Sequence, residues 1–248
     1  MKKLEVLLLA VWSGLFCGVL ESGNLAPNIR LQFLDFLNAY PQRPFFVYIC
    51  YMDANKAYFS SKLNSPISQA VEKYDQAITK LDQEVGTLIA TLRERKLLDN
   101  TILFVTSDHG ESFGARTPQD HDPEGHGTSL YVEQTRVPLI LRFPKKIPSG
   151  QISMQPSSID SIPFMITQLL EFHDSPFAQK PEASILATLR YDERNVTSVI
   201  GKDTQYIHNV ARNLEEFYDL QTDPFEKKNL AGSIDLTLPR TELRHLMR

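Results

Sequence analysis

The residues best suited to chemistry in this chain are Ser-Asp-His-Gly-Glu at positions 107–111. They follow the apolar run Thr101–Thr106, whose β-branched and aromatic residues predict a short buried strand. Asp108 offers a hard carboxylate oxygen and His109 a borderline nitrogen, and Gly110 permits a tight turn that aims both at one point. The pattern therefore predicts half of a divalent-metal site. A strand-end turn with an aspartate helix cap is the alternative interpretation.

Two further histidines lie in a loop that follows this stretch. Residues 115–127 are rich in turn formers and contain His121 and His126, two of the six histidines of the chain. A loop position argues against histidines that are satisfied inside an apolar core, so both are candidates for the same site. An exposed loop histidine without a role remains the alternative for His121.

The elements that must position these residues belong to an α/β fold. Residues 43–52 form a near-continuous apolar run, which predicts a strand buried on both faces of a parallel sheet. It ends at the polar stretch 53–58, as the strand 101–106 ends at Ser107. Ligands of open α/β sheets bind beyond the carboxyl ends of the strands, so the two polar ends begin to define one functional edge.

Between these strands, residues 68–97 place apolar side chains at intervals of three and four, which predicts a long amphipathic helix. A strand, a helix and a strand in this order favour a parallel pair with a right-handed crossover. The other predicted elements are helices at 28–40 and from 157 to 170, a short helix within 128–134, a strand at 136–144, antiparallel strands at 204–208 and 216–220, a turn and short helix at 222–230, and a surface tail.

The composition describes an ordinary globular protein. The 248 residues carry a net charge of −4 with 42% hydrophobic residues, so no basic excess argues for a nucleic-acid partner. Cys17 and Cys50 are the only cysteines, which excludes a disulfide framework and a cysteine-based metal cluster.

The first residues allow two interpretations. The apolar run 6–20 follows Met-Lys-Lys, as in a secretory signal, and is shorter than the about 20 residues of a membrane span. A buried helix, turn and strand of the folded domain is the alternative. We expect no membrane association.

Three blocks together resemble the sulfatase branch of the alkaline-phosphatase-like superfamily. They are the strand ending in Ser-Asp-His-Gly-Glu at 98–114, the segment Gly-His-Gly through Arg-Val-Pro at 125–140, and Glu-Phe-Tyr-Asp-Leu through Asp-Pro-Phe-Glu-Lys-Lys-Asn-Leu at 216–231. The resemblance covers about residues 44 to 232. Any one block would be a weak signal, but three in the same order as in the family are specific.

The resemblance implies a divalent cation, often calcium, that holds the sulfuryl oxygens and is bound by Asp108 and His109. Magnesium, manganese and zinc also suit a carboxylate with an imidazole. His126 matches the family's lysine or histidine at the ester, where it can stabilise the leaving oxygen. Glu111 is expected near the substrate or as a group that orients a ligand. Asn55 stands where the family usually keeps a substrate-proximal histidine, and His121 is a further candidate.

The chain also departs from the family. The family's paired aspartates and its nucleophile, a Cys or Ser within Cys-x-Pro-x-Arg, do not occur: Gly-Val-Leu follows Cys17 and Tyr-Met-Asp follows Cys50. Residues 4–16 also resemble the family's Glu-x-Leu-x-x-x-Gly-Tyr-x-Thr-x-x-Phe segment, which weakens the signal-peptide interpretation. We therefore expect a truncated domain, the C-terminal half to two-thirds of a sulfatase.

The expected fold is thus an incomplete alkaline-phosphatase-like α/β domain, with a mostly parallel sheet in residues 1–175 and small antiparallel strands in 176–248. The expected function is metal-dependent hydrolysis of a sulfate ester on a small molecule or glycan, outside the cytoplasm. The alternatives are a phosphoryl-group relative, such as a phosphoethanolamine or phosphoglycerol transferase, and a catalytically inactive remnant. The missing nucleophile motif leaves the activity of the chain by itself open.

Overall fold

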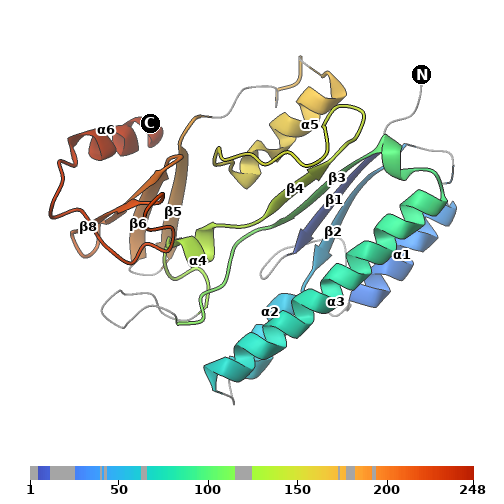
Figure 1. The fold of residues 1–248 in the computed structure, drawn as a ribbon, viewed down its shortest axis with the longest axis horizontal. Coiled ribbons are helices and arrows are strands. Elements are labelled where there is room, and N and C mark those ends of the chain that lie inside the picture. Colours follow the sequence, from blue (N-terminus) through green and yellow to red (C-terminus); the bar gives the residue numbers. More distant parts are fainter. Residues whose placement is uncertain are drawn as a thin grey trace. The chain divides into compact units, whose positions relative to one another are not determined.

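The computed structural model describes residues 5–11, 26–39, 41, 44–62, 66–114, 125–172, 174–176, 182–191 and 194–248. The chain divides into two compact units (Figure 1). The first comprises residues 1–109 and 137–150, and the second comprises residues 110–136 and 151–248. His109 and Gly110, neighbours in the predicted site, therefore lie on either side of a unit boundary.

The first unit contains a four-stranded sheet in the order β2-β1-β3-β4. Its strands are β1 (Glu5–Val11), β2 (Phe46–Tyr51), β3 (Thr101–Ser107) and β4 (Leu139–Arg142). β1 pairs in parallel with both β2 and β3, and β4 pairs antiparallel to β3. The prediction of a mostly parallel sheet is confirmed. The two strands that we expected to be parallel are so, but β1, at the ambiguous N-terminus, lies between them.

Helices pack on one face of this sheet. They are α1 (Ala26–Ala39), α2 (Asp53–Lys62), α3 (Ile67–Glu94) and the short 3-10 helix η1 (Leu98–Asn100). α1 and α3 lie side by side in Figure 1, and Arg30 Nε, on α1, donates to Glu84 Oε2, on α3, at 2.8 Å. Leu81, Leu88 and Leu92 form the buried stripe of α3, which confirms the long amphipathic helix. These leucines join side chains of α1, β2 and β3 in one core cluster.

The strand β3 is buried along almost its whole length, and β2 is not. Ile102 and Phe104 of β3 are 0% exposed. In β2, Ile49 and Tyr51 face the helices, whereas Phe46 is 62% and Tyr48 37% exposed. The prediction that residues 43–52 are buried on both faces is therefore wrong in this structure. β2 is the edge strand of the sheet, and its second face lacks the cover that β3 receives.

The second unit contains an antiparallel sheet in the order β5-β6-β7-β8. Its strands are β5 (Ile185–Tyr191), β6 (Arg194–Ile200), β7 (Thr204–Asn209) and β8 (Leu214–Asp219). The expected antiparallel strands near 204–208 and 216–220 are β7 and β8, while β5 and β6 were not anticipated. The unit also contains α4 (Val132–Thr135), the 3-10 helix η3 (Ile159–Ser161), α5 (Ile162–Leu170) and α6 (Thr237–Leu246).

Both faces of this second sheet are covered. Successive side chains of a strand point to opposite faces, and each face packs against a different part of the unit. Tyr206 of β7 packs with Leu236 and Leu243 at α6, whereas the next residue, Ile207, packs with Leu130 and Tyr131 on the other side. The segment just before α4 therefore lies on one face of the sheet and α6 on the other (Figure 1).

Two predictions for the end of the chain are wrong. Residues 222–230 form turns without a helix, since their polar side chains bond to the backbone: Asp223 Oδ2 accepts from Lys228 N at 2.7 Å. The expected surface tail contains α6, which buries Leu243. Asp235 Oδ1 accepts from Thr237 N at 2.9 Å, and Pro239 falls in the first turn, where a proline does not interrupt helical hydrogen bonds.

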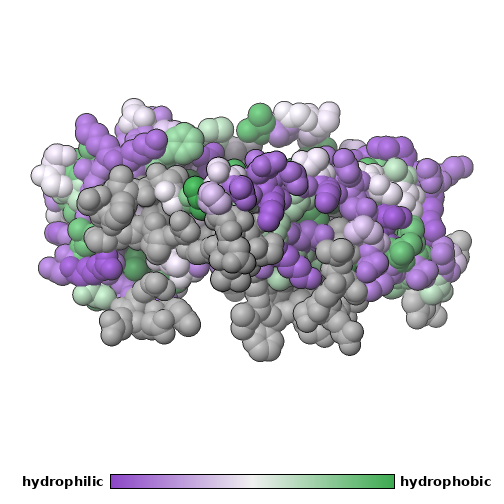
Figure 2. Space-filling model, turned by 90° about the horizontal axis from the view of Figure 1, so that it is seen from below, coloured by the Kyte–Doolittle hydropathy of each residue, from purple (hydrophilic) through white to green (hydrophobic). Residues whose placement is uncertain are grey.

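Among the described residues on the face drawn in Figure 2, hydrophilic ones predominate and hydrophobic ones are scattered between them. None of the helices within the described ranges combines the length and apolar character needed to cross a membrane.

We expect the leucine stripe of α3 to hold the first unit together. Leu88 is 0% exposed within the core cluster, so Leu88→Ala should lower the free energy of unfolding by about 2–5 kcal/mol. The exposed Gln83 on the same helix is the control, and Gln83→Ala should change it by less than about 0.5 kcal/mol. Urea unfolding of the two variants measures the difference. Equal losses would contradict the packing of α3.

We also expect a pH-sensitive ion pair between Arg240 and Glu215 to hold α6 on its sheet. Arg240 donates from Nε to Glu215 Oε1 at 2.7 Å and from Nη2 to Glu215 Oε2 at 2.5 Å. The bonds from Arg240 and Tyr206 lower the pKa of Glu215 from 4.5 to about 2. A lowered folded-state pKa adds stability above the unfolded-state pKa, and this stability is lost as the pH falls from about 4.5 towards 2.

Arg240→Ala should therefore lower the Tm at pH 7, and its deficit relative to the wild type should shrink between pH 4.5 and pH 2. The control is Arg244→Ala, which removes the same charge from an exposed position of α6 that does not contact Glu215. A Tm deficit that is independent of pH, or equal in both variants, would exclude a stabilising role for the Arg240–Glu215 ion pair.

Candidate functional site

The predicted metal ligands lie where the sequence placed them, at the carboxyl end of β3. Asp108 and His109 follow Ser107, the last residue of that strand. Ser107 and Tyr51 are both in register with Val11 of the intervening strand β1, so β2 and β3 end at the same level. Their ends are two strand spacings apart, about 10 Å. One edge of the sheet therefore carries the polar residues that follow both strands.

Asp108 and His109 are half-buried and already ordered. Asp108 Oδ1 accepts from the backbone nitrogen of His109 at 3.1 Å, and Ser107 Oγ donates to the backbone oxygen of His109 at 2.8 Å. The side chains of Asp108 and His109 are 28% and 24% exposed. Asp108 Oδ2 and His109 Nε2 lie 3.8 Å apart. Two donors at this separation can each lie about 2.0–2.5 Å from a single ion.

A complete ligand set is not formed by these residues. Among the residues that the structure describes, no group of three or more His, Cys, Asp or Glu side chains could hold a metal. The strand between β2 and β3 adds no acid directly: Trp12 and Ser13 follow β1 in the sequence, and the first carboxylate after it is Glu21. The donor pair thus suits a divalent ion in chemistry and spacing, and it could supply two ligands.

Glu111 and His126 form the second candidate group. His126 Nδ1 lies 3.0 Å from Glu111 Oε2. The Glu111 side chain is 4% exposed and that of His126 is 20% exposed. A carboxylate only accepts, so Nδ1 is the donor and carries the hydrogen. A general acid at this position would use the other ring nitrogen, Nε2. The sequence offered both residues as separate candidates but not their pairing.

The two segments that carry this pair are joined by backbone hydrogen bonds. Ser112 and Gly125 form an isolated antiparallel bridge, with N–O distances of 3.0 and 2.9 Å. Gly110 N donates to Gln134 O at 2.8 Å. A Cβ atom on Gly110 would lie 2.1 Å from Glu133 O. Gly110 does not have a positive φ, so it is needed for the close approach of two backbones rather than for the tight turn that we predicted.

Of the remaining predicted residues, Asn55 is described by the structure and His121 is not. Asn55 lies in the first turn of α2, just past the end of β2, and is 8% exposed. Sequence reasoning missed Tyr51, the last residue of β2, which is 0% exposed and whose hydroxyl has no hydrogen-bond partner within the described part of the chain. Burial raises its pKa strongly, with a further rise from Glu84 and Asp53. An apolar strand ending in tyrosine gave no signal of this.

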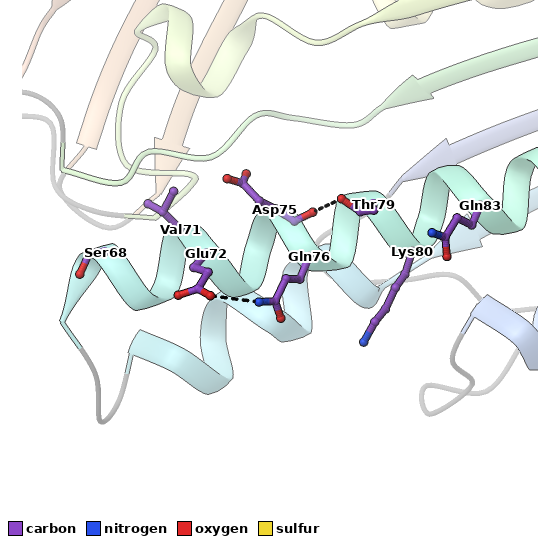
Figure 3. A pocket seen from close by; sticks show the side chains of 8 residues that line it. All are labelled: Ser68, Val71, Glu72, Asp75, Gln76, Thr79, Lys80 and Gln83. Carbon is purple, nitrogen blue, oxygen red and sulfur yellow. Dashed lines mark hydrogen bonds between the residues drawn. The ribbon is translucent and has the colours of Figure 1, made fainter.

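A surface depression on the first unit lies away from this chemistry. It is lined by eight residues of α3 between Ser68 and Gln83, of which only Val71 is apolar (Figure 3). Their bonds are local: Gln76 Nε2 donates to Glu72 Oε1 at 3.2 Å, and Thr79 Oγ1 donates to Asp75 O at 2.9 Å. None of the predicted site residues lines it. We interpret it as a solvated helix face, because its side chains are one helix's own polar residues.

Known proteins match this chain through one family. The family model described as Sulfatase matches residues 23–171, more than half of the chain. N-acetylgalactosamine-6-sulfatase of Canis lupus familiaris is 30% identical over 144 residues, which are 55% of this chain and 27% of that protein. N-acetylgalactosamine-6-O-sulfatase of Bacteroides thetaiotaomicron is 26% identical over 245 residues, 84% of this chain and 48% of that protein.

The fold agrees with these matches. A crystal structure from Bacteroides fragilis, of a protein assigned to the sulfatases, superimposes with a TM-score of 0.67 at 20% identity. The match covers 89% of this chain and 57% of that one. The chain thus spans about half of the length of such proteins, or less, and it has the corresponding part of their fold. The predicted incomplete alkaline-phosphatase-like domain is confirmed.

We expect the contact at Gly110 to be sensitive to a single methyl group. Gly110→Ala puts a Cβ into the carbonyl of Glu133, so the segments must separate, at a cost of about 1–3 kcal/mol in stability. Gly86, in the middle of α3 with nothing within 4 Å, is the control, and Gly86→Ala should be neutral or stabilise by up to about 1 kcal/mol. Thermal unfolding distinguishes the two. A neutral Gly110→Ala would show that the close approach is absent in solution.

Proposed function

Because the chain belongs to the sulfatase family, we propose that it forms the C-terminal part of a metal-dependent sulfate-ester hydrolase. The observation that carries the proposal is the pair Asp108–His109 at the carboxyl end of β3, with donor atoms 3.8 Å apart. The substrate would be a sulfated glycan or small molecule. Two relatives are named for N-acetylgalactosamine 6-sulfate chemistry, which makes a sulfated amino sugar the first compound to test.

In this proposal Asp108 and His109 supply two ligands of a divalent ion, with calcium as the first choice. When bound, such an ion neutralises charge on the sulfuryl oxygens. Asp108 arrives already oriented, because the backbone N–H of His109 holds one of its carboxylate oxygens. The ligands that complete the site, and the nucleophile, would come from sequence outside these 248 residues, since the family's Cys-x-Pro-x-Arg motif does not occur in them.

His126 would act on the leaving group. With Nδ1–H donated to Glu111, a protonated His126 can pass the proton of Nε2 to the oxygen that leaves when the sulfur–oxygen bond breaks. Glu111 fixes the ring and compensates the positive charge, and its own burial limits the alternative positions that the imidazole could take. Asn55 could donate a hydrogen bond from its amide but could not serve as an acid. Asn55 and His121 are thus secondary candidates for substrate contact.

Calcium binding tests the metal pair directly. Ca²⁺ at about a hundred times its Kd should stabilise the wild-type chain by about 2.7 kcal/mol, which is measured as a rise in Tm. Asp108→Ala should abolish the rise. Asp82→Ala, which removes an exposed carboxylate of α3, should retain it. A wild-type Tm that does not respond to Ca²⁺, Mg²⁺, Mn²⁺ or Zn²⁺ would refute the metal site.

Turnover distinguishes the function from its alternatives. In a protein that joins this chain to the nucleophile-bearing N-terminal part of the family's domain, we expect metal-dependent release of sulfate from an aryl sulfate, and we expect His126→Ala to lose it. Release from an aryl phosphate instead would assign the chain to a phosphoryl-transferring relative. No release from either compound, together with an intact calcium response, would identify a non-catalytic remnant that keeps the metal pair.

A further inference from the structure

One short helix touches both segments that carry the Glu111–His126 pair. This helix, α4, has four residues, and its Gln134 is 5% exposed. The backbone oxygen of Gln134 accepts from Gly110 N at 2.8 Å, one residue before Glu111. The main chain of α4 thereby fixes the approach of the first segment.

The side chain of Gln134 fixes the second segment. Its Oε1 accepts from the backbone nitrogens of Thr128 and Ser129 at 3.1 and 3.3 Å. Its Nε2 donates to the hydroxyls of the same two residues at 2.8 and 2.9 Å. All hydrogen-bonding capacity of a buried amide is therefore used on the turn that begins two residues after His126. Buried amides with a full set of partners specify one local conformation.

Two buried carboxylates hold α4 itself. Glu226 is 1% exposed, and its Oε2 accepts from Val132 N, the first residue of α4, at 2.8 Å. Glu216 on β8 is 7% exposed, and its two oxygens accept from the hydroxyls of Tyr131 and Tyr218 at 3.0 and 2.7 Å. A third bond, from Gln205 Nε2 to Leu130 O at 2.7 Å, fixes the residue before Tyr131.

The turn that presents Glu226 is locked by its own polar residues. Asp223 accepts from Lys228 N, and Asn229 Oδ1 accepts from Phe217 N at 3.0 Å and Ala231 N at 2.9 Å. Glu226 has φ +53°, a left-handed conformation that is strained for a residue other than glycine. The C-terminal block of the sequence thus bears backbone strain at the residue whose carboxylate reaches α4.

We propose that Gln134 is a positioning residue that aligns Glu111 with His126, and that Glu216 and Glu226 anchor it to the C-terminal sheet. The catalytic consequence rests on the proposed function, whereas the positioning itself does not. Residues more than 80 positions later in the chain would in this way set the tautomer and orientation of one histidine.

The test follows the His126 side chain by NMR in the full chain. In the wild type we expect His126 in a single state with its proton on Nδ1. Gln134→Leu keeps the volume of the side chain and removes its four hydrogen bonds. It should yield a mixture of tautomers and a faster exchange of the Thr128 and Ser129 amides, by about tenfold or more.

The matched control is Asp235→Ala, which removes two hydrogen bonds to Thr237, the first residue of α6, in the same unit and does not touch residues 125–135. It should lower the Tm while the His126 signals stay unchanged. An unchanged His126 spectrum in folded Gln134→Leu, or an equal change in Asp235→Ala, would overturn the proposal.

A second variant covers the case in which Gln134→Leu does not fold. Glu226→Gln keeps an acceptor for Val132 N but loses the charge, so exchange of the Val132 amide should accelerate and the His126 signals should shift in the same direction by less. No change in either signal would overturn the proposal. A shifted His126, in a protein that also carries the nucleophile-bearing part of the domain but releases no sulfate from an aryl sulfate, would refute the proposed function and support the positioning.

Discussion

A carboxylate that is buried on folding needs hydrogen-bond donors in place of water. Three glutamates of the second unit meet this requirement and connect its segments. Glu111, Glu216 and Glu226 are all buried. Their donors lie 15, 85 and 94 residues away in the sequence, in the order in which the glutamates are named. An unpaired buried charge would cost several kcal/mol, so each glutamate ties its own segment to a distant one. Glu111 bonds to His126, and Glu216 and Glu226 bond to Tyr131 and Val132, which follow His126 in the chain.

The first unit follows a different constraint, that of backbone pairing inside an apolar core. β3 pairs on both sides and is covered on both faces. The polar residues that follow it, from Asp108 on, therefore lie beyond the end of the sheet. Asp108 and His109 are therefore presented by a strand that is among the most deeply buried parts of the chain. Ligand positions in a metal site must be held within fractions of an ångström, and the end of a rigid strand suits that requirement.

The chain belongs to the sulfatase family. The family's nucleophile and its paired aspartates do not occur in these residues, whereas the proposed metal ligands Asp108 and His109, the proposed acid His126 and the C-terminal block do. The C-terminal block bonds mainly to the backbone and to its neighbours. Its aspartate and asparagine residues bind backbone groups, and its Glu226 binds α4. Its contribution is structural support for a site made elsewhere.

The sequence by itself determined the strands and helices with strong periodicity, the α/β class, and Asp108 and His109 at a strand end. These features depend on neighbouring residues, so a local pattern is enough to predict them. Only the tertiary structure decided that Glu111 meets His126, that Gln134 bonds to both of their segments, and that β2 leaves one face exposed. It also revealed α6 behind an apparent tail. Each of these depends on contacts between residues far apart in the chain, which local periodicity and spacing do not encode.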